Sequence, residues 1–236
     1  MSSMEYQTKS DEAVGEILGN RALAAWEIAS VASSIFIAEW IALVAVDWVQ
    51  LSVATPVILA FVLSISSHRW RGETAQDIGF RFDNFLRAAA LLVLPMVVTL
   101  MVCLAIAWLT RAPIDFLRWH VNRPLAVQLI LGFGWGFVQQ YMLQGLINRR
   151  AQMVFGKGWV SVLVVASIFA ALHLPNFWLT VTTFAGGVIW AAVYQRTPNI
   201  FALSISHSVM TWIVVSTLPA SALHDLRIGF KYFAGY

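Results

Sequence analysis

Three glutamines stand close together in an apolar stretch that reads GFGWGFVQQYMLQGLINRR. Gln140 and Gln144 are four residues apart and share a helix face, whereas Gln139 lies about 100° away around the helix. Primary amides inside an apolar helix are costly unless they are hydrogen bonded internally. The pattern therefore predicts either an amide network that joins helices or part of a polar functional site.

Two histidines follow in later apolar segments, and an imidazole can exchange a proton near neutral pH. In FAALH, Phe169 and His173 are four residues apart. In SISHSVMT, one polar stripe crosses an otherwise apolar helix and consists of Ser204, His207, Ser208 and Thr211. Each histidine is open to two interpretations, a satisfied structural residue or a functional one.

Glu39 lies near the middle of the first apolar run, where an ionisable side chain is a functional-site hypothesis. A glutamate is tolerated there in three states. Either Glu39 is protonated and hydrogen bonded, or it is paired with a cation such as a protonated histidine, or it lines a wet cavity. Glu27 and Asp47 lie nearer the ends of that run, where water is within reach.

The composition says what surrounds these groups. Of 236 residues, 59% are hydrophobic and 11% charged, and the mean hydropathy is +0.74. So much apolar surface must meet lipid, which excludes an ordinary soluble enzyme, a disordered chain and a small disulfide scaffold. The net charge of +3 does not indicate nucleic-acid binding, because the basic residues lie between apolar runs rather than in one patch. The single cysteine, Cys103, cannot form an internal disulfide and is expected to be a core residue.

The apolar runs predict an all-α fold, a polytopic transmembrane helix bundle of about seven spans, within a range of about six to eight. The fifth run is short, and the breaks at Asp47-Trp48 and at residues 173–176 allow only tight turns between antiparallel helices. Gly132, Gly134 and Gly136 predict close helix packing in the fourth run. The expected runs are Ala24–Val46, Val49–Ser66, Phe85–Leu109, Pro124–Ile147, Trp159–Leu172, Phe177–Tyr194 and Ile200–Leu218.

These runs divide the chain into four parts. We expect a polar tail or short surface helix at 1–23, a two-span hairpin at 24–67, a membrane core at 68–218 and a C-terminal tail at 219–236. Lysine and arginine are more numerous in the N-terminal tail and in the loops on its side, which predicts a cytoplasmic N-terminus.

The spacing of the polar groups resembles the CAAX-protease and bacteriocin-processing family (CPBP, or Abi), polytopic intramembrane endopeptidases similar to the type II CAAX prenyl protease. The family pattern is EExxxR, then FxxxH, then HxxxN or HxxxD. Here QQYMLQ stands at the first motif, FAALH fits the second and HSVMT stands at the third. The surrounding stretches RGETAQDIGF, GLINRRAQMVFGKG and AGGVIWAAVYQRTPNIFALSISH are also similar, so the likeness covers about residues 68–212.

In the family the first glutamate activates a water, while the histidines and the asparagine hold the water and the developing oxyanion. The resemblance places His173 and His207 at the family's histidines. The other positions differ, with Gln139 and Gln140 for the two glutamates, Gln144 for the arginine and Thr211 for the asparagine. Two negative charges and one positive charge are lost together, which leaves a site that stays satisfied without ions.

This change is chemically severe. A carboxamide cannot accept a proton near neutral pH, and losing a positioned base costs roughly 10²–10⁴-fold in rate. We expect no cofactor and no metal, because His173 and His207 without a carboxylate fall short of the usual three protein ligands.

Three hypotheses follow. The first is a CPBP-like protein of the bacterial cytoplasmic membrane that has lost proteolysis and holds a transmembrane or lipidated polypeptide, surrounded by membrane lipids, as an assembly or regulatory subunit. The second is an active intramembrane endopeptidase in which His173, His207 or Glu39 has become the base. The third is a proton-coupled carrier that uses Glu39 and the histidines, although the chain has no evident inverted repeat.

Overall fold

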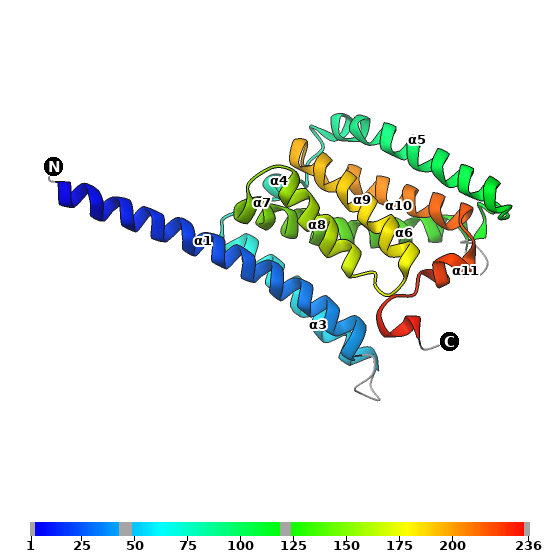
Figure 1. The fold of residues 1–236 in the computed structure, drawn as a ribbon, viewed down its shortest axis with the longest axis horizontal. Helices are drawn as coiled ribbons and strands as arrows, with labels where there is room; N and C mark the ends of the chain where they lie inside the picture. Colours follow the sequence, from blue (N-terminus) through cyan, green and yellow to red (C-terminus); the bar gives the residue numbers. More distant parts are fainter. Residues whose placement is uncertain (1–2, 43–48, 119–123, 234–236) are drawn as a thin grey trace.

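The computed structural model describes residues 3–42, 49–118 and 124–233, and within these ranges the chain is helical, with short connections and no strand (Figure 1). The expected all-α bundle is therefore confirmed. The long helices are α1 (Ser3–Ile37), α3 (Val49–Trp70), α5 (Phe85–Thr110), α6 (Leu125–Gln140), α8 (Trp159–Ala171), α9 (Phe177–Arg196) and α10 (Ile200–Thr217).

Shorter elements complete the fold. Two π-helical segments, η1 (Ala38–Ala42) and η3 (Tyr141–Asn148), continue α1 and α6 without a break. The others are α4 (Ala75–Ile78), α7 (Arg149–Phe155), α11 (Ala220–Leu223), and two short 3-10 turns, η4 (His224–Leu226) and η5 (Gly229–Tyr232).

Four helical stretches of the described chain are long and apolar enough to cross a membrane, namely Gly15–Ile41, Phe85–Thr110, Phe177–Arg196 and Ile200–Thr217. The protein is accordingly an integral membrane protein. Helix α8 has 13 residues, which is about 20 Å at 1.5 Å per residue and less than the roughly 30 Å of a bilayer's hydrocarbon. That agrees with the short fifth run, while the total of about seven crossings stays a prediction.

The N-terminal region, for which the sequence predicts a polar tail or a short surface helix, is helical from Ser3 onward. Helix α1 runs without interruption from Ser3 into the first apolar run, because no proline stops a helix that propagates from that run. Its beginning extends beyond the bundle, and its later part packs along α3 (Figure 1). The predicted break at Asp47-Trp48 lies outside the described residues.

Segment η3 joins two hydrophobic cores. The larger core is formed by α5, α8, α9 and α10 around Leu143 and Ile147. The smaller one contains Val31 of α1 and Ala60 of α3, packed against Met142 and Leu146. Residues 142–148 of η3 are all buried, so this segment is the centre of the molecule.

Helices α6 and α10 approach closely at a glycine, as predicted. A Cβ atom on Gly136 would lie 2.9 Å from Ser208 Oγ and 3.2 Å from Ser204 O. The Ser208 hydroxyl also donates to Gly132 O across the same interface at 3.1 Å. Gly134 has open space around its Cβ position, so the packing prediction is correct for Gly132 and Gly136 but not for Gly134.

Two buried asparagines start α9 and α10 and tie each start to a distant loop. Asn176 accepts a hydrogen bond from Leu179 N and donates to Leu223 O and Arg227 O. Asn199 likewise accepts from Ala202 N, and its amide donates to Arg81 O and to Asn84 Oδ1. Helices α8 and α9, joined by residues 172–176, pack along each other as the predicted hairpin.

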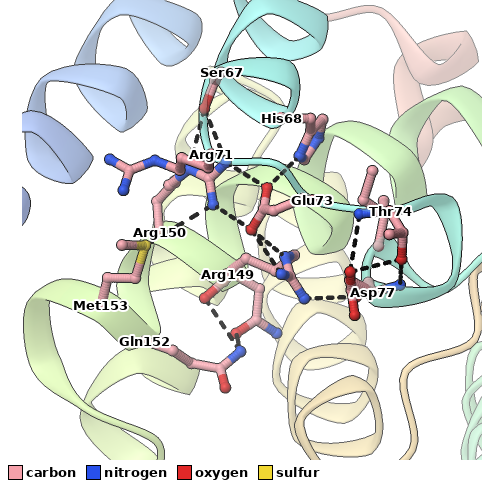
Figure 2. Close-up of polar contacts among 12 residues, drawn as sticks. Ser67, His68, Arg71, Glu73, Thr74, Asp77, Arg149, Arg150, Gln152 and Met153 are labelled. Carbon is pink, nitrogen blue, oxygen red and sulfur yellow. Dashed lines mark hydrogen bonds and ion pairs between the residues drawn. The ribbon is translucent and has the colours of Figure 1, made fainter.

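A buried ion-pair network holds the α1–α3 hairpin against α7. Figure 2 shows the part of it around Glu73, with Ser67, His68, Arg149 and Arg150. The Arg150 side chain is 0% exposed and lies 2.8 Å from Glu27 Oε2 and 2.7 Å from Glu73 Oε2. It also donates to Ser67 Oγ at 2.8 Å, while Arg71 donates to Glu27 Oε2 at 3.1 Å. Sequence reasoning treated these residues only as loop charges and missed the network.

Glu73 is the centre of this network. Arg149 and Arg150 donate to its Oε1, and His68 Nδ1 lies 2.6 Å from its Oε2. Burial by itself raises the pKa of Glu73, but the hydrogen bonds from Arg150, His68 and Arg149 outweigh it and hold the pKa well below its usual range. Glu73 is therefore ionised and shared among cations.

Candidate functional site

Gln140 and His207 meet between α6 and α10. Gln140 Nε2 lies 3.0 Å from His207 Nδ1, and both side chains are buried. Because an amide nitrogen only donates, Nδ1 is the acceptor and the imidazole carries its proton on Nε2. The two motif positions thus form a pair without formal charge.

Aromatic rings fix both imidazoles. Trp190 stacks on His207 with ring centroids 4.4 Å apart and planes 9° from parallel. Phe169 packs edge-on against His173 at 4.7 Å and against His207 at 6.0 Å. Phe169 therefore packs against both histidines. Trp190 was missed, since one tryptophan among eleven carries no distinguishing sequence signal.

His173 follows the end of α8 and has one ring nitrogen engaged. Its Nδ1 lies 2.7 Å from Phe169 O, which can only accept. Nδ1 is therefore the donor, and Nε2 keeps a lone pair. His173 could accept a proton or hydrogen bond through Nε2.

A cavity of about 340 Å³ brings Glu39 together with Gln139 and His173. Its wall is mainly apolar, from α1, α3, η3 and α8, and Lys231 of the C-terminal segment completes it. Phe169 and Leu172 also line it, whereas Gln140 and His207 do not. The residues singled out in the sequence therefore fall into two sets. Glu39, Gln139 and His173 line the cavity, whereas Gln140 and His207 form the buried pair. Phe169 lines the cavity and also packs against His207.

Glu39 lines this mainly apolar cavity. Its Oε2 is buried and unpaired, and within the described ranges no hydrogen bond or ion pair joins its carboxyl to His173, Gln139 or Lys231. An unpaired buried carboxyl oxygen is costly and has the capacity to bind a donor that enters the cavity.

Gln144 faces away from the histidines into an amide network. Its Oε1 accepts from Asn148 Nδ2 at 2.7 Å, and Asn148 Oδ1 accepts from Gln195 Nε2 at 3.1 Å. Gln195 also donates to Ser161 Oγ and so joins α9 to α8. The predicted structural amide network is present around Gln144. Asn148 was missed, although it follows Gln144 at the same four-residue spacing.

The polar stripe on α10 does not act as one surface. The Thr211 hydroxyl donates to His207 O at 2.9 Å, and the Ser204 and Ser208 hydroxyls donate to carbonyls one turn earlier. The Thr211 side chain is therefore occupied by its own helix and contacts neither imidazole through a hydrogen bond. Within the stripe, only His207 makes a side-chain hydrogen bond to another motif position.

The donor set does not assemble a metal centre in the part of the chain that the structure describes. There, His, Cys, Asp and Glu form no group of three or more that could hold an ion. Gln140 Oε1 and Gln144 Nε2 are both buried without a partner. One is an acceptor and the other a donor, so a small polar group such as water could satisfy each.

The family model described as type II CAAX prenyl endopeptidase Rce1-like matches residues 116–213. This range contains Gln139, Gln140, Gln144, both histidines and Thr211, and the suspected resemblance to CAAX-type proteases is thereby confirmed. Helical fold, apolar spans and motif positions together define a membrane protein that is CAAX-protease-like. Glu39 lies outside the matched range. No curated protein and no solved structure matches the chain.

Proposed function

We propose that this protein is a non-proteolytic CAAX-protease-like membrane protein that uses its cavity to hold a transmembrane or lipidated segment of another polypeptide, as an assembly or regulatory subunit. The observation that carries the proposal is the Gln140–His207 pair, an uncharged buried contact at the position where the motif resemblance would put the family's second glutamate.

The amides at the motif positions support the loss of hydrolysis for a physical reason. The resemblance puts Gln139 at the water-activating glutamate, and a carboxamide cannot take up a proton near the working pH as a base must. His207 Nδ1 is occupied by Gln140, and His173 Nδ1 by Phe169 O. The arginine position is also an amide, Gln144, so the resemblance leaves no charged side chain at these three motif positions.

The cavity supports the binding role. Its wall is mainly apolar, and its volume of about 340 Å³ lies within the usual range for small-molecule sites, roughly 300–1,000 Å³. It is large enough for a stretch of lipid chain or a few apolar side chains. Glu39, Gln139 and His173 supply polar contacts for a backbone or head group.

A direct test uses the purified protein in nanodiscs with a fluorescent farnesylated peptide and an unmodified transmembrane peptide. We expect binding of at least one of them without cleavage, and loss of binding when Val138, which lines the cavity, is changed to Trp. The matched control is Leu94→Trp, because Leu94 lies on α5, is 70% exposed and does not line the cavity. This variant should bind the peptides normally. Cleavage of either peptide that His173→Ala or His207→Ala abolishes would refute the proposal.

One observation favours a second candidate, an intramembrane endopeptidase with a relocated base. Glu39 lines the same cavity as His173 and Gln139, and a carboxylate there could deprotonate a water. This candidate predicts that Glu39→Gln eliminates cleavage of the transmembrane peptide, while Gln139→Ala only slows it. Cleavage that persists in the Glu39→Gln protein would exclude Glu39 as the base.

A further inference from the structure

The C-terminal segment forms part of the wall of the cavity that Glu39 and His173 also line. Ile228 and Lys231 contribute to its wall, although they are nearly 200 residues from Glu39 in the chain. In Figure 1 this segment, in red, passes between the end of the α1–α3 hairpin and the start of α9. The cavity is therefore bounded by parts of the chain that only tertiary structure brings together.

Gly229 makes the closest approach. A Cβ atom at this position would lie 2.6 Å from Glu39 O and 2.9 Å from Glu39 Cβ. Gly229 also has a φ of +55°, a left-handed conformation that favours glycine. Its N–H donates to Leu174 O at 2.8 Å, next to His173. One glycine thus touches the segment that carries Glu39 and the turn that carries His173.

Other contacts also hold the segment and its end, among them Tyr232 Oη at 3.2 Å from His224 Nε2 and the ring of Trp40 in η1 at 6.4 Å from that of Phe233. Asn176 Nδ2 holds Arg227 O at 3.1 Å, and Phe230 is 37% exposed. Just before it, His224, Asp225 and Leu226 all have positive φ. Consecutive non-glycine residues in this conformation are strained, and strain of this kind is relieved when a segment moves.

We propose that residues 227–232 form a strap that opens to admit ligand to the cavity, and that Gly229 is the positioning residue that lets the strap close onto Glu39. The idea rests on the proposed function, because it concerns how that cavity is entered. Any side chain at position 229 would push the strap away from η1 and leave the Glu39 side of the cavity open.

The test measures access without any partner. In a Cys103→Ser background, Gln139→Cys places a thiol on the cavity wall for reaction with a water-soluble maleimide. We expect Gly229→Ala to raise its labelling rate by about tenfold or more. The matched control is Gly72→Ala, because Gly72 has a similar φ of +64° and open space at its Cβ position. That variant should stay within about twofold of the parent.

A labelling rate that is unchanged in folded Gly229→Ala protein would overturn the strap. If Gly229→Ala does not fold, Ile228→Ala removes a wall side chain without altering the backbone and should also raise labelling, and an unchanged rate there would overturn it equally. Because labelling needs no peptide, failure of peptide binding would count against the proposed function and leave the strap result standing.

Discussion

Gln140 donates a hydrogen bond to Nδ1 of His207 across 3.0 Å, and both side chains are buried. The contact gives the imidazole a partner without any formal charge. An amide and a neutral histidine can be buried together at far lower cost than an ionised pair whose counter-ion has been lost. The Gln140–His207 hydrogen bond can therefore be buried as a structural contact without a counter-ion.

This relationship predicts a measurable stability cost. Gln140→Ala leaves His207 Nδ1 buried without a partner, which should lower the free energy of unfolding by about 1–3 kcal/mol. Gln76→Ala, at an exposed position, is the control and should change it by less than about 0.5 kcal/mol. Unfolding of the detergent-solubilised protein in SDS or urea gives both values, and equal stability of the two variants would contradict the contact.

The α6–α10 interface predicts opposite effects for two neighbouring glycines. Gly136→Ala places a methyl group 2.9 Å from Ser208 Oγ and should destabilise the protein by about 1–3 kcal/mol. Gly134→Ala meets nothing within 4 Å and should be neutral or stabilising by up to about 1 kcal/mol, because alanine favours the helix. Thermal unfolding in detergent measures both changes. Similar losses at the two positions would show that α6 does not approach α10 at Gly136.

The buried network predicts a larger effect. Glu73→Gln removes one anion from the fully buried Arg150, and breaking a buried pair in this way costs about 3–5 kcal/mol. Asp83→Asn is the control, because the Arg81–Asp83 pair is largely exposed, and exposed pairs of this kind contribute little to stability. Chemical unfolding of both variants tests this, and a small loss for Glu73→Gln would mean that Glu27 alone neutralises Arg150.

The same carboxylate predicts a pH dependence. The pKa of Glu73 lies below its ordinary value of 4.5 in the folded protein, so its contribution to stability is fully present above 4.5. As the pH falls through and below that value, the unfolded chain takes up the proton first, and the contribution is lost. The free energy of unfolding, followed from about pH 7 to about pH 3, should therefore fall more steeply for the wild type than for Glu73→Gln. Parallel curves would contradict this linkage.

Much of the site could be predicted because helical spacing is a local property. The four-residue interval places Phe169 beside His173, and Gln140 and Gln144 on one side of the helix. It does not say which neighbouring helix each side meets. Gln140 meets His207, but Gln144 meets Asn148 and Gln195, so two glutamines that are equivalent in the sequence have different roles.

The remaining contacts depend on parts of the chain that are far apart. The positions of Arg150 and Glu27 indicated only charges near span ends, yet packing of the α1–α3 hairpin against α7 brings them to 2.8 Å. Trp190 likewise became a site residue because α9 and α10 place its ring on His207.

By itself, the sequence determined that this chain is a helical membrane protein, which segments are apolar, and where amides and histidines stand along them. Composition and helical periodicity are enough for those conclusions, since each depends on neighbouring residues or on totals. Only the tertiary structure decided that Glu39, His173 and the strap around Gly229 share one cavity. The physical reason is that such a cavity is made by the faces of packed helices and a C-terminal turn, and which faces meet is set by close packing across the whole bundle.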